Sequence, residues 1–267
     1  MRRITLLLLA SAMIVCALVA PALADRPEPA TTFVLDAAGE RELAVTLPDM
    51  ALFAGPPGAR ADLGVRAVAA AFDRQGRIWY VTPNMSLHCL DGRTDRTILG
   101  PKCVNSPIYL DATGERLAFT WPDDFMGDMP LTNGVAVFDL GLQRIQVWAC
   151  IPGHTLYCYG WLGDRLIVVR PWGQTADFYA LSSDGGLEPL VGLQGLPVVR
   201  QFGQRSFDGH YIAYGADQGT VLVDCRRGTY CIVGGGRYPN WTAAGLNVYR
   251  QRYTGVPEPV LLEVTNP

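Results

Sequence analysis

The sequence is poor in lysine and histidine, which excludes several common enzyme motifs. Lys102 is the only lysine and follows Pro101, so the Gly-Lys pair of a phosphate-binding P-loop is absent. None of the three histidines opens a His-Glu-x-x-His zinc motif, and no serine lies in a Gly-x-Ser-x-Gly nucleophile elbow. No Gly-x-Gly-x-x-Gly opens a helix either. The sequence therefore predicts no catalytic residue and no cofactor from these motifs.

Long apolar runs are missing except at the N-terminus, where the pattern is that of a secretion signal. Arg2 and Arg3 precede an almost wholly apolar stretch, Ile4–Ala20, and Ala22-Leu23-Ala24 supplies the small residues of a signal-peptidase site. A membrane anchor is the alternative, but it needs about 20 apolar residues and no cleavage site. We expect a signal peptide over residues 1–24, cleavage after Ala24 and a secreted or periplasmic protein.

Positive charge is also scarce in the expected mature chain, residues 25–267. Removing Arg2 and Arg3 from 22 basic residues leaves 20 against 25 acidic ones, a net charge of −5. An acidic balance argues against a general affinity for nucleic acids or anionic membranes. After signal cleavage no second membrane span is expected.

Cysteines are few but even in number once Cys16 leaves with the signal, because six of the seven remain. An even number in an exported chain indicates disulfides, and six cysteines allow fifteen pairings. Local spacing favours three pairs: Cys89–Cys103, Cys150–Cys158 and Cys225–Cys231. The alternative for any one pair is two free, buried thiols. The spacing Cys150-x3-His154-x3-Cys158 does not match a familiar zinc pattern.

One local pattern recurs six times: a polar turn that ends in glycine, followed by an alternating apolar run. The glycines are Gly39, Gly76, Gly114, Gly163, Gly209 and Gly245, at spacings of 37, 38, 49, 46 and 36 residues. A further apolar strand is expected after each run, at residues 50–54, 86–90, 134–140, 175–182, 219–225 and 258–264. Outer strands are expected at 96–100, 144–150, 187–192 and 229–234. Such a period is close to the four strands of a propeller blade, and no stretch of the mature chain shows a helical period.

Two of these segments resemble known propeller repeats. Ser206-Phe207-Asp208-Gly209 followed by Ile212-Ala213-Tyr214, and Leu117-Ala118-Phe119 after Gly114, resemble the repeats of TolB-type and WD-like propellers. The resemblance implies an all-β fold, a propeller of antiparallel four-stranded blades with six blades favoured. Residues 25–267 would form this single domain. The alternative is five blades plus a closing N-terminal segment, because residues 33–45 also read as a hairpin that completes the last blade.

In a propeller, the loops between second and third strands and the connections between blades emerge on one face. We expect that face to hold residues 82–86, 121–133, 171–175, 215–219 and 253–258, with connections at 100–106, 151–154 and 234–239. Aromatic and arginine side chains favour binding. The candidates are Trp121, Asp123, Asp124, Phe125, Asp128, Arg170, Trp172, Arg237, Tyr238 and Tyr253. The alternative for each aromatic is that it caps the end of a blade core.

Residues 121–133 form the longest predicted insertion and contain three aspartates within six residues. Carboxylate oxygens suit a hard cation such as Ca²⁺, so Asp123, Asp124 and Asp128 form a candidate calcium site. Their spacing does not fit an EF-hand loop, and an acidic, solvated loop explains the pattern equally well.

The leading functional hypothesis is an exported, non-enzymatic scaffold that binds a protein or peptide through this face. A metal-dependent propeller enzyme is the first alternative, since residues 72–81 also resemble the blades of gluconolactonase-type and lyase propellers. That resemblance implies a metal held by carboxylates from several blades, with Asp62, Asp123 and Asp217 as candidates. A carbohydrate-binding lectin is the second alternative, given the tryptophan-rich loops.

Overall fold

The structure, a computed structural model, describes most of the expected mature chain. The described residues are 31–35, 40–46, 49–56, 59–126, 129–206, 209–233, 236–242, 245–250 and 258–260. The predicted signal peptide and its cleavage site lie outside them. Among the described residues no helix is long and apolar enough to cross a membrane.

The strands form six antiparallel sheets, A to F, each built from strands that are consecutive in the chain. Sheet A contains β1 (Thr31–Leu35), β2 (Glu42–Thr46), β3 (Ala51–Gly55) and β4 (Ala61–Arg66); sheet B contains β5 (Ala69–Phe72), β6 (Ile78–Val81), β7 (Leu87–Asp91) and β8 (Thr94–Leu99). Sheet C contains β9 (Asn105–Leu110), β10 (Arg116–Met126), β11 (Met129–Asp139) and β12 (Arg144–Ala149).

The second half of the chain continues the same order. Sheet D contains β13 (Tyr157–Leu162), β14 (Arg165–Trp172), β15 (Thr175–Leu181) and β16 (Leu187–Pro189), with β17 (Leu196–Pro197) as an extra strand on β15. Sheet E contains β18 (Gln201–Arg205), β19 (Tyr211–Ala216), β20 (Gly219–Asp224) and β21 (Thr229–Val233). Sheet F contains β22 (Tyr238–Thr242), β23 (Gly245–Tyr249) and β24 (Glu258–Val260).

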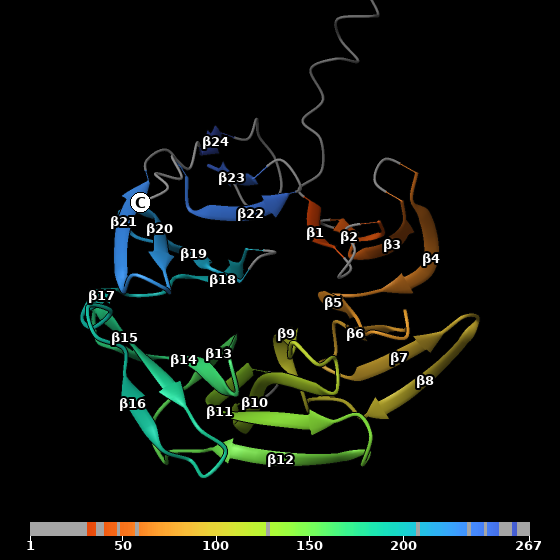
Figure 1. Cartoon of the computed structure of the whole chain (residues 1–267), viewed down its shortest axis with the longest axis horizontal. Helices are drawn as coiled ribbons and strands as arrows, with labels where there is room; N and C mark the ends of the chain where they lie inside the picture. Colours follow the sequence, from red (N-terminus) through yellow and green to blue (C-terminus); the bar gives the residue numbers. More distant parts are fainter. Residues whose placement is uncertain are drawn as a thin grey trace, which may run out of the picture.

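The sheets stand side by side around one axis, as the view down the short axis shows (Figure 1). The first strand of each sheet lies innermost, and neighbouring inner strands contact one another around the ring. Strand β1 contacts β22, so the first and last sheets meet and close the ring. The predicted all-β propeller of small antiparallel sheets is therefore confirmed.

The number of complete blades differs from the six that the sequence favours. Five sheets have four or more strands, whereas sheet F has three among the described residues. The alternative of five complete blades is thus the better description. The N-terminal segment does not join the last sheet, because β1 pairs with β2 and β2 with β3 in sheet A.

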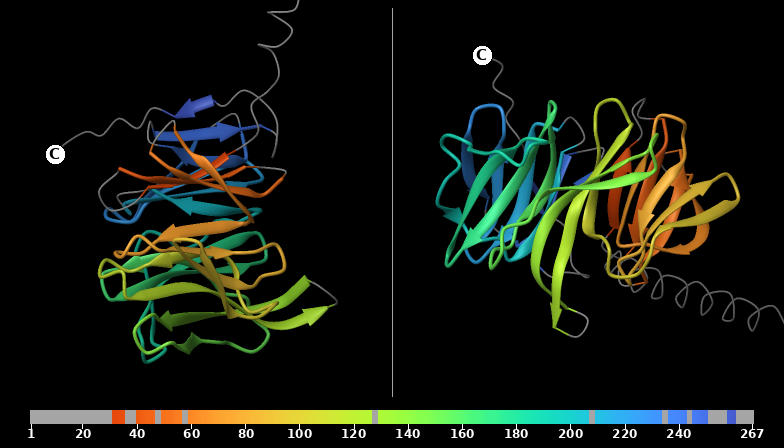
Figure 2. Two further views of the ribbon diagram at one scale, coloured as in Figure 1. Left: turned by 90° about the vertical axis from the view of Figure 1, so that its right-hand side faces the viewer. Right: turned by 90° about the horizontal axis from the view of Figure 1, so that it is seen from below.

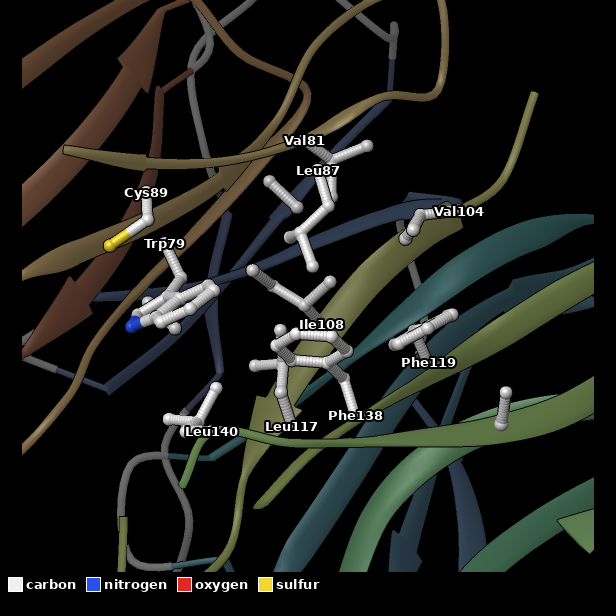
Figure 3. Close-up of a cluster of buried hydrophobic side chains, with 13 residues drawn as sticks. Trp79, Val81, Leu87, Cys89, Val104, Ile108, Leu117, Phe119, Phe138 and Leu140 are labelled. Atoms are coloured by element: carbon white, nitrogen blue, oxygen red, sulfur yellow. The ribbon is translucent and has the colours of Figure 1, made fainter. Parts of the chain in front are cut away.

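Hydrophobic clusters fill the spaces between neighbouring sheets. Strand β6 shows how one short strand serves two of them: Trp79 and Val81 face sheet C, whereas Ile78 and Tyr80 face sheet A. This alternation follows from the period of two in a strand. Because both faces of the strand are covered, all four residues are apolar or aromatic and all are buried. Figure 3 shows the cluster between sheets B and C.

The predicted glycine turns join the first strand of a sheet to the second, and an aspartate fixes two of them. Gly76 and Gly114 have φ of 77° and 68°, a region in which glycine avoids a Cβ clash. In the first turn, Asp73 Oδ1 accepts from the backbone N–H of Arg77 at 2.9 Å and Oδ2 accepts from Arg77 Nε at 2.6 Å. Asp111 accepts the corresponding hydrogen bonds from Arg116 in the next sheet. The repeated sequence pattern therefore encodes the same hydrogen-bonded turn in both sheets.

The Asp111 turn gives the protein a defined acid sensitivity. Burial acts to raise the pKa of Asp111, but hydrogen bonds from Arg116 and Thr113 outweigh it, so this pKa lies below its ordinary value. A depressed folded-state pKa stabilises the fold above the unfolded pKa, about 3.9, and this contribution is lost as the pH falls through the folded-state value. We expect Asp111→Asn to lower the urea midpoint at pH 7 and to flatten its decline below about pH 4.

The control is Asp164→Asn, which changes an exposed aspartate in the corresponding turn of sheet D. Its urea midpoint should follow that of the unmodified protein at every pH. Parallel pH profiles for Asp111→Asn and the unmodified protein would contradict the assignment.

The predicted loop over residues 121–133 is instead the end of a long β-hairpin. Strands β10 and β11 stay paired from Trp121↔Gly134 to Met126↔Met129, with register shifts on either side of Asp124. Pro122 borders the first shift, where the missing N–H of a proline is tolerated. The hairpin projects beyond the rest of sheet C, as both views of Figure 2 show.

The three predicted disulfides are not formed in the structure, and the strand register gives the physical reason. All six remaining cysteines lie among the described residues, and none of the predicted pairs is bonded. Cys231 lies opposite Leu222, three residues from Cys225, so the two cysteines are about 10 Å apart along the strand. A disulfide requires Cα atoms within about 7 Å. Spacing about Gly228 predicted a symmetric hairpin, whereas the hairpin turns between Asp224 and Thr229.

The other two pairs are separated for related reasons. The N–H of Cys103 donates to the carbonyl of Met85, four residues before the buried Cys89, again a separation of about 10 Å or more. The N–H of Cys158 donates to Thr120 Oγ1 on β10, whereas Cys150 follows β12, two strands away. Burial raises the pKa of the Cys158 thiol to about 12, which keeps it protonated and unreactive.

Candidate binding face

The turns between second and third strands and the connections between sheets gather at one end of the ring, which we call the connection face. It comprises the described parts of the β6–β7, β10–β11, β14–β15 and β19–β20 turns and of the β8–β9, β12–β13, β17–β18 and β21–β22 connections. Up-and-down pairing places them together, because antiparallel neighbours alternate in direction. The expected ranges 82–86, 100–106, 151–154, 171–175 and 215–219 fall on this face, as do the described residues 236–239. The range 121–133 reaches it as a paired hairpin, and residues 253–257 lie outside the described part of the chain.

Three side chains of sheet D and the β12–β13 connection form a compact group. Nη2 of Arg170 lies 3.2 Å from both ring nitrogens of His154. The Arg170 guanidinium carbon lies 5.1 Å from the ring centroid of Trp172, within cation–π range. The His154 and Trp172 rings are 5.7 Å apart. We call these three residues the Arg170 site. Trp172 is 59% exposed, so the site lies at the surface.

Turn geometry places Trp172 there. Trp172 pairs with Thr175 across a two-residue turn, and Gly173 has φ of 59°, as a tight hairpin turn requires. Thr175 Oγ1 donates to the Trp172 carbonyl at 3.1 Å, which further fixes the turn. Arg170 and Trp172 lie on the same side of β14 because they are two positions apart, with one residue between them.

A second polar group lies on the other side of this turn. Arg200 donates through Nε to Asp217 Oδ2 at 3.0 Å and through Nη2 to Gln174 Oε1 at 3.1 Å. Arg237 Nη2 donates to the Asp217 carbonyl at 2.9 Å. The group therefore links the β14–β15 turn to the next two connections of the ring.

The remaining predicted residues are distributed differently. Trp121 is partly buried, packs against the cluster between sheets B and C, and has its ring 6.4 Å from that of Phe119. Trp121 therefore caps the end of a blade core, which is the alternative given for each aromatic candidate in the sequence analysis. Tyr238 is half-buried on β22. The side chains of Asp123, Asp124 and Phe125, and all of Asp128 and Tyr253, lie outside the described part of the chain, so the calcium site stays a prediction.

Sequence reasoning missed several members of the two groups. Arg200 lies in the β17–β18 connection, which was not among the predicted connections, and Gln174 was included only as part of a range. His154 was included only as part of the predicted connection 151–154 and as a possible ligand between two cysteines. A useful signal would have been the polar residues in every connection between sheets, since all of these emerge on one face.

Two of the three carboxylates proposed for a metal-dependent enzyme, Asp62 and Asp217, lie in different sheets and do not converge. Asp62 lies exposed on β4, the outermost strand of sheet A, and its Oδ1 accepts from the Gly64 N–H at 2.8 Å. Asp217 lies in the β19–β20 turn of sheet E, paired with Arg200. The six innermost strands contain no Asp, Glu or His. Among the described residues no three His, Cys, Asp or Glu side chains form a potential metal-binding group.

Comparison with solved structures finds the same fold at low sequence identity. TolB from Acinetobacter baumannii matches with a TM-score of 0.54 and 14% identity over 88% of this chain, which spans 65% of that TolB chain. A gluconolactonase from Xanthomonas campestris matches with a TM-score of 0.56 and 15% identity, covering 87% of this chain and 90% of the enzyme. A chain of a nidogen/laminin complex matches with a TM-score of 0.54 and 13% identity, covering 76% and 78%.

These similarities establish the propeller fold. No protein-family model matches the sequence, and no curated protein sequence matches it.

Proposed function

We propose that this chain is an exported, non-enzymatic propeller that binds a protein or peptide partner through its connection face. Export is inferred from the signal-peptide pattern of residues 1–24. A protein partner is inferred from the fold, since one structurally similar protein occurs in a nidogen/laminin complex, and from the acidic balance of the chain. The fold itself serves many functions, so the site carries the argument.

The observation that carries the proposal is the exposure of Trp172 beside Arg170. An indole that is 59% exposed is uncommon on the described surface, where the other five tryptophans are buried or partly buried. Exposed tryptophan and arginine side chains are the residue types most often found at the energetic centre of protein interfaces. Both side chains are held in place by local turns and stacking, which lowers the entropy lost on binding.

Replacing Trp172 with alanine is expected to lower the recovery of a bound partner about tenfold, as for an interface hot spot. The immobilised protein is used to capture partners from extracts of its own exported fraction, and the captured proteins are quantified by mass spectrometry. Trp172 is a cleaner probe than Trp121, whose loss would also disturb a core.

Tyr230→Ala is the control, because Tyr230 is 45% exposed but lies on the outer strand β21. Partner recovery should be unchanged in this variant. Undiminished recovery with Trp172→Ala, or an equal loss with Tyr230→Ala, would reject the connection face as the binding surface.

A metal-dependent enzyme is the second candidate, supported by the similarity to a gluconolactonase. Two observations weigh against it: the innermost strands contain no carboxylate, and Asp73, within the segment that resembles lactonase blades, is engaged with Arg77 in a turn. The two candidates are separated by elemental analysis of the purified protein. One divalent ion per chain, lost in Asp217→Asn, would favour the enzyme.

A further inference from the structure

We propose that the Arg170 site binds a carboxylate of the partner, next to an apolar side chain that packs on Trp172. This inference rests on the proposed function and adds to it the chemistry that the face recognises. The carboxylate comes either from an Asp or Glu side chain or from the C-terminus of a peptide, and the experiment below separates these two sources.

Arg170 lacks an acidic partner within the described part of the chain, in contrast to other arginines of the fold. Arg77, Arg116 and Arg200 each form an ion pair with an aspartate at 2.6–2.9 Å. Arg170 forms none with the described residues, and its Nε is buried without a hydrogen-bond partner there. A buried charged donor without an acceptor is unfavourable, so a ligand that supplies an anionic acceptor is favoured.

The nearest candidate for an internal partner is already engaged. Asp177 lies opposite Arg170 in the β14–β15 register. Its Oδ1 accepts instead from the backbone N–H of Gly195 at 2.7 Å. Asp217, the acid of the neighbouring polar group, is bonded to Arg200. Neither carboxylate therefore satisfies Arg170, which leaves its charge without an anion among the described residues.

The two aromatic rings give the site its shape. Nη2 of Arg170 is 3.2 Å from the ring nitrogens of His154, and the guanidinium also lies within cation–π range of Trp172. Contact with two rings restricts the rotation of a long side chain before a ligand binds. The exposed indole then offers an apolar surface beside the charge, which fits an aromatic or aliphatic residue next to the carboxylate.

The charge of the surroundings fits the same ligand. Arg170 belongs to one of the two groups described above and Arg200 and Arg237 to the other. The only acid in these groups is Asp217, which is bonded to Arg200. A local excess of arginine in a chain of net negative charge attracts an acidic partner. Arginine is suited to carboxylates because its planar fork donates two parallel hydrogen bonds.

The test uses the purified protein and two arrays of hexapeptides in a Gly-Ser background. Each peptide contains Asp, Glu, Asn or Gln next to Phe, Leu or Gly. In one array the peptides are attached through a blocked C-terminus, and in the other the C-terminal carboxylate is free. The strongest binders are then measured in solution by the fluorescence anisotropy of labelled peptides.

We expect acidic peptides with Phe or Leu to bind about tenfold more tightly than their amide counterparts, as for one charge-assisted hydrogen-bonded contact. If the C-terminus is the source, peptides with Phe or Leu bind about tenfold more tightly in the array with free carboxylates than in the blocked array, whichever of Asp, Glu, Asn or Gln they contain. Arg170→Gln should remove the preference. Arg165→Gln, which removes a charge from the opposite end of the same strand, should preserve it.

The carboxylate site would be overturned if acidic and amide peptides bound equally and the free and blocked arrays also bound equally, or if the preference survived Arg170→Gln. So would the absence of any binding peptide in both arrays. The broader proposal is judged separately by partner recovery with Trp172→Ala, so the connection face can remain valid when the carboxylate site fails. Circular dichroism of Arg170→Gln shows that a lost preference does not result from unfolding.

Discussion

Replacing Trp79 with alanine is expected to lower the free energy of unfolding by about 3–5 kcal/mol, the range found for buried tryptophan truncations. Trp79 is 1% exposed and lies between sheets B and C, with its ring 6.1 Å from that of Phe138 (Figure 3). Its Nε1 also donates to Asp73 Oδ2 at 2.9 Å, so the substitution removes both packing and a hydrogen bond of the turn.

The size of this loss follows from the ring architecture. Each sheet of a propeller buries its faces only against its neighbours, so no other contact compensates for a cavity between two of them. The free energy of unfolding of an ordinary domain is about 5–15 kcal/mol, so the expected loss is a large fraction of it. The measurement is urea-induced unfolding followed by tyrosine and tryptophan fluorescence and by circular dichroism.

Two variants separate the contributions. Trp79→Phe keeps most of the volume and should cost about 1 kcal/mol for the lost hydrogen bond, plus part of the packing. Trp172→Ala removes an exposed indole and should change stability by less than about 0.5 kcal/mol. A cost for Trp79→Ala as small as that for Trp172→Ala would show that sheets B and C do not depend on this contact.

The strands and turns could be predicted from the sequence because local chemistry determines them. Gly76 and Gly114 need a positive φ, and Asp73 and Asp111 bond to the backbone of the same turn, so each repeat carries the information for its own hairpin. The alternation of residues in β6 likewise reflects two covered faces. The fold followed from these signals, although the number of complete blades did not.

The cysteine pairs could not be predicted in the same way because spacing along the chain does not determine register. Cys225 and Cys231 are symmetric about Gly228 in the sequence, yet Cys231 is paired with Leu222. One shift of register carries a residue about 3.3 Å along the strand and to the other face. Apolar periodicity identifies a strand without specifying its register. A disulfide prediction, in contrast, fails if the register is wrong by one residue.

The candidate site was predictable only in part, for a different reason. Arg170 and Trp172 could be assigned to the connection face because both lie near a predicted turn. Their grouping with His154, and that of Arg200 with Gln174, depends on contacts between segments 16 to 26 residues apart. Such contacts require the relative placement of neighbouring sheets, which the turn pattern alone does not contain.

The contact between sheets D and E at their outer edge gives the second large effect. Gly192 has φ of 80°, and a Cβ built on it would overlap the carbonyl oxygen of Gly228. Gly228 is restricted in return, since its own Cβ would lie 2.6 Å from the Val191 carbonyl oxygen. Both obstacles are backbone atoms, which cannot rotate away as a flexible side chain can. The two backbones therefore approach as closely as glycine permits.

Gly192→Ala should accordingly lower the free energy of unfolding by about 2–4 kcal/mol, combining a left-handed backbone cost of about 1–2 kcal/mol with the steric overlap. Gly195→Ala is the matched control, because Gly195 lies in the same loop with φ of 68° but has no atom within 4 Å of the added Cβ. It should show the backbone cost alone. Urea unfolding of both variants measures the difference, and equal losses would mean that the loop moves away from Gly228 at no cost. A larger loss in Gly192→Ala would establish that the outer edges of sheets D and E are joined by backbone contact, in addition to the apolar cluster between them.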